Sequence, residues 1–399
     1  CFNCCIMESI KLILISQAEI YSPENIGIKD ILISGETIIA IADKIDASTL
    51  KPFNVKVIDA KGKRAIPGLI DAHVHIAGAG GEGGPSTRTP EMQLSQMIVG
   101  GITSIVGCLG TDGVTRRPDS VLMKVKSLKA EGVSAWMYTG SYQVPTPTIT
   151  GAIDRDLALI DEVIGVGEIA LSDHRSSVPT TNELIRIAEQ ARVGGMLGGK
   201  AGIVNIHMGD AKNPFNPIVE AVKNSELKYK QFFPTHCNRN DYIFEDAKTY
   251  GKDGYVDITA SSYPYFAEYE VKPSTSIKEL LNAGVPIEHI TMTSDGNGSL
   301  PHFDDNGELV RLEMGQPKSI FTEMSEAVTM DKLPLEVALK TVTSNVSRIL
   351  KLRNKGNIRV GADADIVIIE NDFTIVEVIS RGKVMLSDKK LLTKGTYEH

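Results

Sequence analysis

Two histidines separated by one residue begin the part of the sequence that could do chemistry. His73 and His75 lie in the stretch IDAHVHIAGAGGEGGP, where an apolar run leads into a glycine-rich loop. Residues i and i+2 of a β-strand point to the same face, so both imidazoles can face one site. Taken alone, such a pair fits a buried structural role as well as it fits a metal ion.

Four further polar side chains stand at the ends of later apolar runs, namely Glu168, His207, His236 and Asp295. Imidazole and carboxylate groups are ligands that zinc prefers, whereas burying them without partners would be costly. The sequence therefore predicts a site for two Zn²⁺ ions, or for one, with the ligands His73, His75, Glu168, His207, His236 and Asp295.

Eight apolar runs must position these side chains. Between residues 67 and 355 they alternate with helix-like stretches, which is the pattern of parallel βα units. The runs are GLIDAHVH, GITSIVGC, SAWMYTGS, VIGVGEIAL, AGIVNIHM, QFFPTH, GYVDITAS and HITMTSDG. They predict an α/β fold with a (β/α)₈ TIM-like barrel, in which active-site residues gather where the strands end and the loops begin.

Short alternating strands occupy both ends of the chain. LILISQAEIY, KDILISGETIIAIAD and VKVIDA precede the barrel, and ADIVIIEND and IVEVISRGKVM follow it. We therefore expect a small β-sandwich domain built from residues 7–66 and 356–394, with the barrel formed by residues 67–355. Residues 395–399 are expected to be a tail, and residues 1–6 a remnant of upstream or cloning-derived sequence.

Composition limits the partners and the location. A formal net charge of −8 argues against nucleic acid, which calls for a basic face. No apolar run approaches the roughly 18 residues of a membrane helix, and the start of the chain lacks the pattern of a secretory signal. Of the five cysteines, Cys1, Cys4 and Cys5 are crowded together, which is not a disulfide framework. We expect a cytoplasmic protein with reduced thiols that binds neither nucleic acid nor a membrane.

A set of motifs lies around the predicted strands. They are PGLIDAHVH, GGEGGPSTRTPE, SIVGCLGTD, SAWMYTGSYQVP, SDHRS, HMGD, PTHCNRN and SDGNGS. Together they resemble the motifs of isoaspartyl (β-aspartyl) dipeptidases, a family of the amidohydrolase superfamily. The resemblance covers nearly the whole chain from residue 7 onward, and GADADIVI near the C-terminus is typical of the flanking β domain of the superfamily.

The resemblance implies a metallo-dipeptidase that hydrolyses isoaspartyl dipeptides by a metal-bound hydroxide. It also implies a homo-oligomer, an octamer in this family. His73 and His75 match the ligands of a buried metal ion, and His207 and His236 match those of a second ion. Asp295 matches a carboxylate that touches the metal and acts as general base and then as general acid.

The substrate site follows from the same resemblance. Tyr142 matches a tyrosine that polarises the scissile carbonyl. An isoaspartyl dipeptide carries two carboxylates and one ammonium group, which two arginines and one glutamate would meet. The positions that match substrate-binding residues are Glu82, Arg175, Arg239 and Ser299, with backbone contacts from Gly80 and Thr111.

The sequence departs from the family at one position. The family commonly bridges its metal ions with a carbamylated lysine on the fourth strand, where this chain has Glu168. A glutamate offers the same bridging carboxylate without needing carbon dioxide, but it is shorter, so the backbone must come closer. The number of metal ions, two or one, is left open by this change.

Two other classes of function remain as alternatives. A cyclic-amide hydrolase of the dihydroorotase or hydantoinase type, or an N-acyl deacetylase, would share the metal site but not the set of Glu82, Arg175 and Arg239. A non-catalytic, assembly-forming relative would have lost the metal ligands. Hydrolysis of β-Asp-Leu compared with α-Asp-Leu and dihydroorotate separates the enzymatic alternatives.

Overall fold

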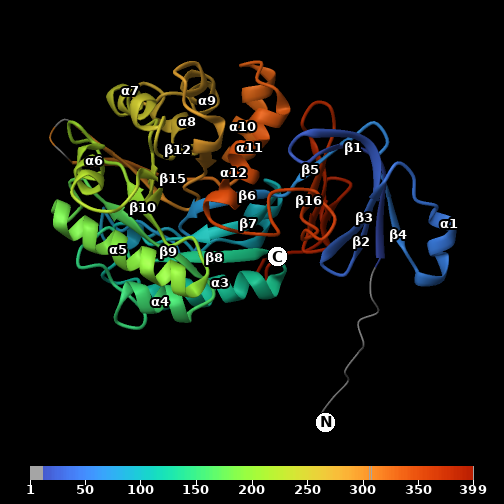
Figure 1. Ribbon diagram of the computed structural model, residues 1–399, viewed down its shortest axis with the longest axis horizontal. Coiled ribbons are helices and arrows are strands. Elements are labelled where there is room, and N and C mark those ends of the chain that lie inside the picture. Colours follow the sequence, from blue (N-terminus) through green and yellow to red (C-terminus); the bar gives the residue numbers. More distant parts are fainter. Residues whose placement is uncertain (1–11, 305, 307, 399) are drawn as a thin grey trace, which may run out of the picture.

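The structure is a computed structural model that describes residues 12–304, 306 and 308–398 of the chain. The expectation for residues 1–6, with their three cysteines, lies outside the described residues. Figure 1 shows a barrel surrounded by helices and, beside it, a sheet to which both ends of the chain contribute. The predicted fold class is therefore confirmed.

Eight parallel strands build the barrel within the described residues. They are β6 (Leu69–Val74), β7 (Ile102–Gly107), β8 (Ser134–Thr139), β9 (Val163–Ala170), β10 (Ile203–His207), β11 (Phe232–Thr235), β12 (Val256–Thr259) and β13 (Ile290–Thr293). Each lies in one of the predicted apolar runs, and each is buried along its whole length except for one residue of β8. Continuous apolar runs of this kind suit strands that are covered on both faces.

Hydrogen bonds at the strand ends close the barrel. Strands β6 to β11 form one hydrogen-bonded arc, and β12 pairs with β13 in a second arc. The amide of His75 donates to the carbonyl of Gly296 at 2.9 Å, and the amide of Asp295 donates to the carbonyl of His73 at 3.1 Å. The end of β13 is thus tied to the end of β6, which brings the first and last predicted ligands together.

Helices cover the outside of the barrel. The longest of them, α5 (Thr181–Gly198), begins with a capping box in which Thr180 and Glu183 satisfy each other's amides. It buries residues spaced three and four apart, such as Leu184, Ile187 and Ala188. The other helices of the barrel are α2 (Leu94–Ile98), α3 (Pro118–Glu131), α4 (Ile153–Leu159), α6 (Asn216–Lys223), α7 (Asp241–Tyr250), α8 (Tyr263–Phe266), α9 (Pro273–Asn282), α10 (Ser319–Thr329), α11 (Leu335–Val342) and α12 (Ser344–Ile349), with short 3₁₀ turns at Pro85–Thr87, Tyr229–Gln231 and Ile287–His289.

The second part is one continuous sheet of nine strands in the described chain. Its order is β19-β18-β17-β16-β5-β1-β2-β3, and β4 pairs with β1. The antiparallel pairing of β5 with β16 joins the two ends of the chain. The strands are β1 (Leu12–Tyr21), β2 (Asn25–Ser34), β3 (Thr37–Ala42), β4 (Lys56–Asp59), β5 (Arg64–Pro67), β16 (Ile366–Ile369), β17 (Ile375–Ser380), β18 (Lys383–Ser387) and β19 (Lys390–Leu391), and α1 (Ala47–Leu50) with a 3₁₀ turn at Lys51–Phe53 lies between β3 and β4.

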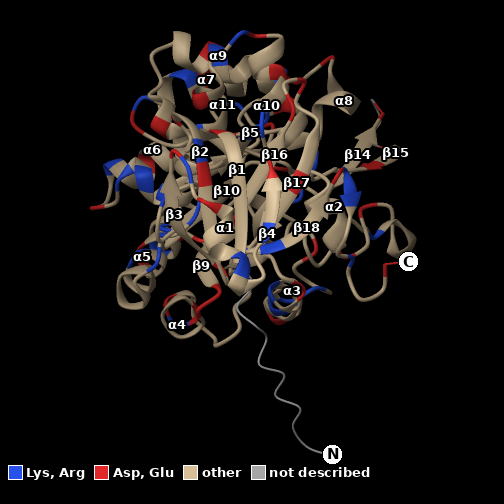
Figure 2. Cartoon of the chain, turned by 90° about the vertical axis from the view of Figure 1, so that its right-hand side faces the viewer, with Lys and Arg blue, Asp and Glu red and all other residues tan. Residues whose placement is uncertain are grey.

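This sheet encloses an apolar cluster of its own. Ile15 and Ile31, from the N-terminal half, pack in one cluster with Ile366 and Ile368 from the C-terminal half. On the side drawn in Figure 2, basic and acidic residues are interspersed over the strands and helices. The exact domain boundaries stay a prediction, and β5 runs across the expected boundary between residues 66 and 67.

A hairpin that the sequence analysis did not predict follows the last barrel strand. It consists of β14 (Ser299–Phe303) and β15 (Leu309–Met314), which pair antiparallel. Its residues are mostly half-buried or exposed, so the segment lacks the apolar run that marked the barrel strands. The hairpin positions Ser299 beside the barrel mouth.

Three predictions concern the membrane, the assembly and the location of the protein. Among the helices of the described residues, none has both the length and the hydropathy to span a membrane. The octamer and the cytoplasmic location are not tested by a single chain, so both stay predictions.

A buried aspartate holds three barrel strands together beneath the barrel mouth. Asp257, on β12, accepts hydrogen bonds of 2.6 Å from Thr235 on β11 and from Thr291 and Thr293 on β13. All four side chains are fully buried. Because β11 leads to His236 and β13 leads to Asp295, this cluster fixes the relative height of two candidate site residues.

We expect Asp257→Ala to destabilise the protein by about 3–5 kcal/mol, because it leaves three buried hydroxyl groups without their acceptor. For a chain of this size, that loss corresponds to a fall in Tm of about 5 °C. The measurement is thermal unfolding followed by circular dichroism. Asp257→Asn, which keeps an acceptor oxygen, should cost less, and exposed Asp246→Ala serves as the control. An Asp257→Ala variant with the parental Tm would contradict this role.

Candidate metal and substrate site

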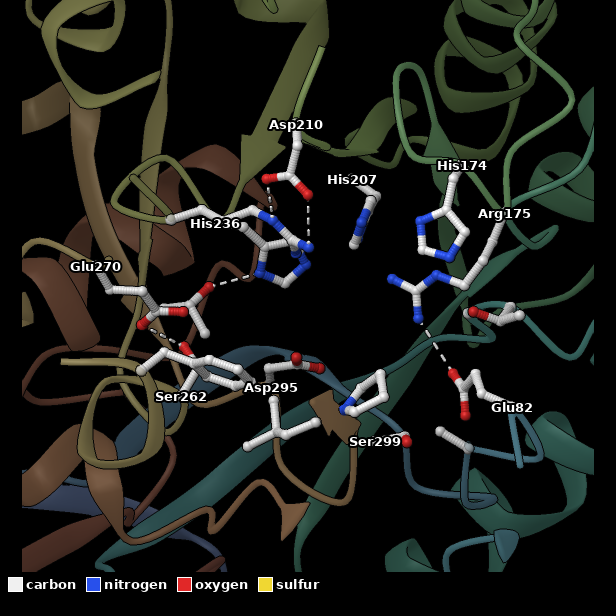
Figure 3. Close-up of a pocket in the computed structure, with 18 of the residues that line it drawn as sticks. Glu82, His174, Arg175, His207, Asp210, His236, Ser262, Glu270, Asp295 and Ser299 are labelled. Carbon is white, nitrogen blue, oxygen red and sulfur yellow. Dashed lines mark hydrogen bonds and ion pairs between the residues drawn. The ribbon is translucent and has the colours of Figure 1, made fainter. Parts of the chain in front are cut away.

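The candidate site residues converge at the ends of the barrel strands. Of the six candidate ligands, His75, His207, His236 and Asp295 border a pocket of about 740 Å³, whereas His73 and Glu168 do not line it. In Figure 3, His207, His236 and Asp295 lie in the middle of the pocket, with Glu270 on one side and Arg175 on the other. This is the end of the barrel where the loops begin, as the sequence analysis expected.

One cluster, which we call the inner group, contains His73, His75, Glu168 and Asp295. The Nε2 atom of His73 lies 3.4 Å from Glu168 Oε2 and 3.7 Å from Asp295 Oδ1. The Nε2 atom of His75 lies 3.1 Å from Asp295 Oδ1 and 3.8 Å from Glu168 Oε2. Two imidazoles and two carboxylates therefore meet around one point.

A second cluster, the outer group, uses the other oxygen of the same glutamate. Glu168 Oε1 lies 2.6 Å from His207 Nδ1 and 3.1 Å from His236 Nε2. The carboxylate of Glu168 is thus placed between two pairs of histidines, with one oxygen facing each pair. This is the geometry of a bridging ligand, and it arises with a glutamate at the position where the family resemblance suggested a carbamylated lysine.

The donor atoms of the outer group lie close enough together to hold one divalent cation. The outer donors of Glu168, His207 and His236 lie within 4.8 Å of one another. Glu168 is 1% exposed, and its Oε2 accepts no hydrogen bond of normal geometry from the described residues. A buried carboxylate oxygen without a donor is costly unless a cation is bound there. The ligand roles of these side chains stay a prediction that this geometry suits.

Polar partners orient two of the imidazoles. The Nδ1 atom of His73 lies 3.0 Å from Asn205 Oδ1, and the Nδ1 atom of His236 lies 2.7 Å from Thr259 Oγ1. In both rings the Nε2 atom is left to face Glu168. Hydrogen bonding of one ring nitrogen to an outer partner is the usual way in which metal-binding histidines are held.

Charges in the site are strongly coupled. Burial acts to raise the pKa of Glu168, but the imidazoles of His73 and His207 outweigh it and hold that pKa well below its ordinary value. Burial also acts to raise the pKa of Asp295, and the hydrogen bond with His75 outweighs it, so this pKa is lowered as well. Burial lowers the pKa of His236 to about 4, which keeps its imidazole neutral. Two carboxylates and the neutral imidazole of His236 are protonation states that metal binding needs. Burial acts to lower the pKa of His73 and of His75, but charge interaction with Cys108 outweighs it and raises both, so these two imidazoles must give up a proton when a metal ion binds.

A cysteine that the sequence analysis did not single out as a site residue lies beside the inner group. Cys108 follows β7, and its Sγ atom lies 3.7 Å from His73 Nε2 and 3.9 Å from His75 Nδ1. Burial acts to raise the pKa of its thiol, but charge interaction with the two histidines outweighs it and lowers the pKa. The signal that could have revealed it was its place at the end of the predicted run GITSIVGC, equivalent to the places of the histidines in other runs.

Tyr142 lies over the outer group. Its hydroxyl is 2.9 Å from His207 Nδ1. Burial, reinforced by the charge of Glu168, raises the pKa of Tyr142 well above its ordinary value. The phenol therefore stays protonated at neutral pH and is available as a hydrogen-bond donor.

Arg175 and Glu82 form one wall of the pocket. Arg175 donates to Asp173 through Nε at 2.8 Å and through Nη2 at 2.7 Å, and its Nη1 donates to Glu82 Oε1 at 3.1 Å. Burial acts to lower the pKa of Arg175, but the neighbouring Tyr142 and Asp173 outweigh it and raise that pKa. Glu82 Oε2 is buried and accepts no hydrogen bond within the described part of the chain, so one carboxylate oxygen is left for a ligand.

Arg239 is held in the same way by an aspartate. It donates to Asp210 through Nε at 2.8 Å and through Nη2 at 3.1 Å. Neither Asp210 nor Asp173 was singled out from the sequence. In the sequence, Asp210 follows His207 by three residues in the motif HMGD, and Asp173 precedes Arg175 by two residues in the motif SDHRS. That spacing in the sequence was the signal that could have revealed them. Both aspartates fix a guanidinium plane so that its remaining N–H groups can meet a ligand.

The remaining predicted substrate residues also lie on the pocket. Gly80, Thr111 and Ser299 line it, and the buried Ser299 hydroxyl has no hydrogen-bond partner among the described residues. Glu270, which the sequence analysis did not predict, lines the opposite side and accepts a 2.8 Å hydrogen bond from Ser262. Burial raises the pKa of Glu270 to about 7.

Comparison with known proteins places this arrangement in a family. Residues 200–385 match the Amidohydrolase family, whose members are metal-dependent. The chain is 25% identical over 395 residues to an allantoinase of Bacillus licheniformis, covering 87% of this chain and 83% of that protein. The structure also resembles a dihydropyrimidinase of Brevibacillus agri, with a TM-score of 0.66, 16% identity and coverage of 96% and 97% of the two chains. At that identity the likeness shows the shared fold.

A much nearer relative is the β-aspartyl dipeptidase of Fervidobacterium islandicum, whose structure was solved in complex with β-Asp-Leu. It has a TM-score of 0.88 and 42% identity to this chain, and the match covers 95% of this chain and 98% of that one. The chain therefore belongs to the β-aspartyl dipeptidase family of the amidohydrolase superfamily, and it is a hydrolase.

Proposed function

We propose that this enzyme hydrolyses isoaspartyl dipeptides, using metal ions held by the inner and outer groups. The observation that carries the proposal is the near full-length likeness, at 42% identity, to a dipeptidase crystallised with β-Asp-Leu. The pocket adds independent support, because Arg175, Arg239 and Glu82 all border it. These are the three charged groups that the substrate's two carboxylates and one ammonium group require.

The inner group and the outer group would each hold one Zn²⁺ ion, with Glu168 shared between them. When bound, such ions supply Lewis acidity, lower the pKa of water and add positive charge to a pocket whose own acidic groups outnumber its arginines. Both oxygens of Glu168 are engaged in this arrangement, which favours two ions over one.

Asp295 is the residue placed to move the proton. Its Oδ1 atom lies at the centre of the inner group, and its depressed pKa keeps it an acceptor at neutral pH. It takes a proton from the attacking water and then delivers that proton to the leaving amine. Tyr142 keeps its hydroxyl proton and donates a hydrogen bond to the oxygen on which negative charge develops.

Substrate selection depends on the two arginine–aspartate pairs. Because Asp173 and Asp210 already fix the guanidinium groups, little side-chain entropy is lost when a carboxylate binds. Among the described residues, one oxygen of Glu82 and the hydroxyl of Ser299 have no hydrogen-bond partner, and they are placed to receive the ammonium group and a further polar atom. A cyclic amide such as dihydroorotate offers fewer charges to these residues, which is why we place the dipeptide first.

Substrate comparison tests the proposal directly. The purified enzyme should hydrolyse β-Asp-Leu at least ~100-fold faster, in kcat/KM, than α-Asp-Leu or dihydroorotate, because buried polar groups left unpaired reject incomplete substrates. Chelation should abolish the activity and Zn²⁺ should restore it. A clear preference for dihydroorotate or allantoin would overturn the proposal in favour of a cyclic amidohydrolase.

Asp295→Asn tests the proton transfer. We expect kcat to fall by about 10²–10⁴-fold, since the amide cannot accept and return the proton. Metal content, measured by elemental analysis of the same preparation, should stay close to that of the parent. Substantial activity in a metal-loaded Asp295→Asn enzyme would rule out the assigned role.

Arg239→Ala tests carboxylate recognition. Loss of charge-assisted hydrogen bonds should raise KM for β-Asp-Leu about 10–100-fold with a smaller change in kcat. Asp210→Asn should raise KM less, because the guanidinium remains but is held less firmly. The exposed residue Arg155 provides a charge-matched control, and Arg155→Ala should leave KM unchanged. A parental KM in Arg239→Ala would remove this residue from the substrate site.

A further inference from the structure

Cys108 is a buried thiol at the metal site to which neither the resemblance nor the proposed mechanism assigns a role. It lies directly after β7, the barrel strand that pairs with β6, and β6 carries His73. Its exposed fraction is 0%, and its thiol is free. His73 and His75 of the inner group lie next to its sulfur atom.

The sulfur of Cys108 lies beside both histidines of the inner group. Cys108 Sγ is 3.7 Å from His73 Nε2 and 3.9 Å from His75 Nδ1. One donor atom from each of Cys108, His73, His75 and Glu168 can be chosen so that all four lie within 4.8 Å of one another. Four donors from three strand ends therefore surround a volume the size of a single ion.

Two of these separations agree with the spacing of donor atoms around one zinc ion. Zinc bond lengths of about 2.3 Å to sulfur and about 2.0–2.1 Å to nitrogen or oxygen imply sulfur–nitrogen distances of roughly 3.5 Å and nitrogen–oxygen distances of roughly 3.4 Å. The corresponding distances are 3.7 Å from Cys108 Sγ to His73 Nε2 and 3.4 Å from His73 Nε2 to Glu168 Oε2. For these two pairs, binding would change the separation by only a few tenths of an ångström.

A second observation points to a cation at the same place. Glu168 Oε2, the oxygen nearest to His73, is buried and accepts no hydrogen bond of normal geometry within the described residues. A free buried cysteine is ordinarily a small core residue, and Cys108 does approach the carbonyl oxygen of Val74 at 3.6 Å. Cys237 shows that ordinary case, since it is buried with its sulfur 3.4 Å from the carbonyl oxygen of Pro234.

We propose that Cys108 is a thiolate ligand of the inner metal ion, alongside His73, His75 and Glu168 and with Asp295 as a further donor. This inference rests on the metal dependence in the proposed function. On binding, the thiol proton leaves to solvent and the sulfur lone pair forms the bond to the divalent ion. A thiolate is a soft ligand, so the inner group should prefer Zn²⁺ or Co²⁺ over Mn²⁺ and Mg²⁺.

Cobalt spectroscopy on the full chain tests this proposal. Protein loaded with Co²⁺ should show a near-ultraviolet thiolate-to-cobalt charge-transfer band. The band should keep its parental intensity in Cys237→Ser and lose intensity in Cys108→Ser, while the visible bands of bound Co²⁺ remain. Because Cys1, Cys4 and Cys5 are present in every variant, their binding of cobalt cannot account for that difference. A band of parental intensity in Cys108→Ser would overturn the proposal.

Zinc affinity gives a second measurement. For the inner ion, Cys108→Ser should weaken binding by more than about 100-fold, beyond the range usual for groups that only orient a ligand. Competition with a chromophoric chelator measures the loss, and Cys237→Ser should bind zinc as the parent does. Equal affinities in the two variants would show that Cys108 is not a ligand.

Alkylation of the parent protein keeps the test independent of any variant that fails to fold. Because Cys108 and Cys237 are both buried, iodoacetamide reaches them only when the structure opens locally, so the measured quantity is the rate of modification of each peptide by mass spectrometry. Zinc should slow the modification of Cys108 at least ~10-fold more than that of Cys237, and an equal effect of zinc on both cysteines would contradict the proposal. The proposed activity is judged separately: thiol protection without β-Asp-Leu hydrolysis would refute the substrate alone, and hydrolysis without protection would refute the ligand alone.

Discussion

A carboxylate buried between two pairs of imidazoles is the constraint on which the rest of the structure depends. Glu168 is 1% exposed, and its two oxygens face different histidine pairs. Burial disfavours an ionised group unless opposite charge surrounds it. The barrel supplies that surrounding from strand ends that are far apart in the sequence. The Glu168 carboxylate is therefore surrounded by imidazoles only when the whole barrel has closed.

Closure in turn depends on buried polar contacts as well as on apolar packing. The Asp257 cluster fixes the strands that lead to two candidate ligands, and the amide of Asp295 is bonded to the carbonyl of His73. A hydrogen bond with Asn205 orients the ring of His73, and hydrogen bonds to Asp173 fix the guanidinium group of Arg175 in the pocket wall. A site held in this way is organised before its ligand arrives, which reduces the entropy lost on binding.

The same barrel serves cyclic-amide hydrolases and dipeptidases, as its likeness to a dihydropyrimidinase at 16% identity shows. Fold alone therefore does not choose the substrate. In the proposed function the choice depends on segments that follow the strands and border the pocket: the glycine-rich loop with Glu82, the turn with Arg175 after β9, and the hairpin that begins at Ser299. Conformational freedom is needed in the first of these, where Gly80 has a φ of +78°.

The sequence by itself determined the barrel strands, the β domain from both chain ends and the polar residues at the strand ends, because hydrophobic periodicity and residue type are local properties. It also showed that Glu168 stands where the family commonly has a carbamylated lysine, which left the number of metal ions open. Only the tertiary structure decided that the two oxygens of this glutamate face separate histidine pairs, that Cys108 lies beside His73, and that Asp210 holds Arg239. These are contacts between residues distant in the chain, and the closure of the barrel, which no single segment encodes, brings them together.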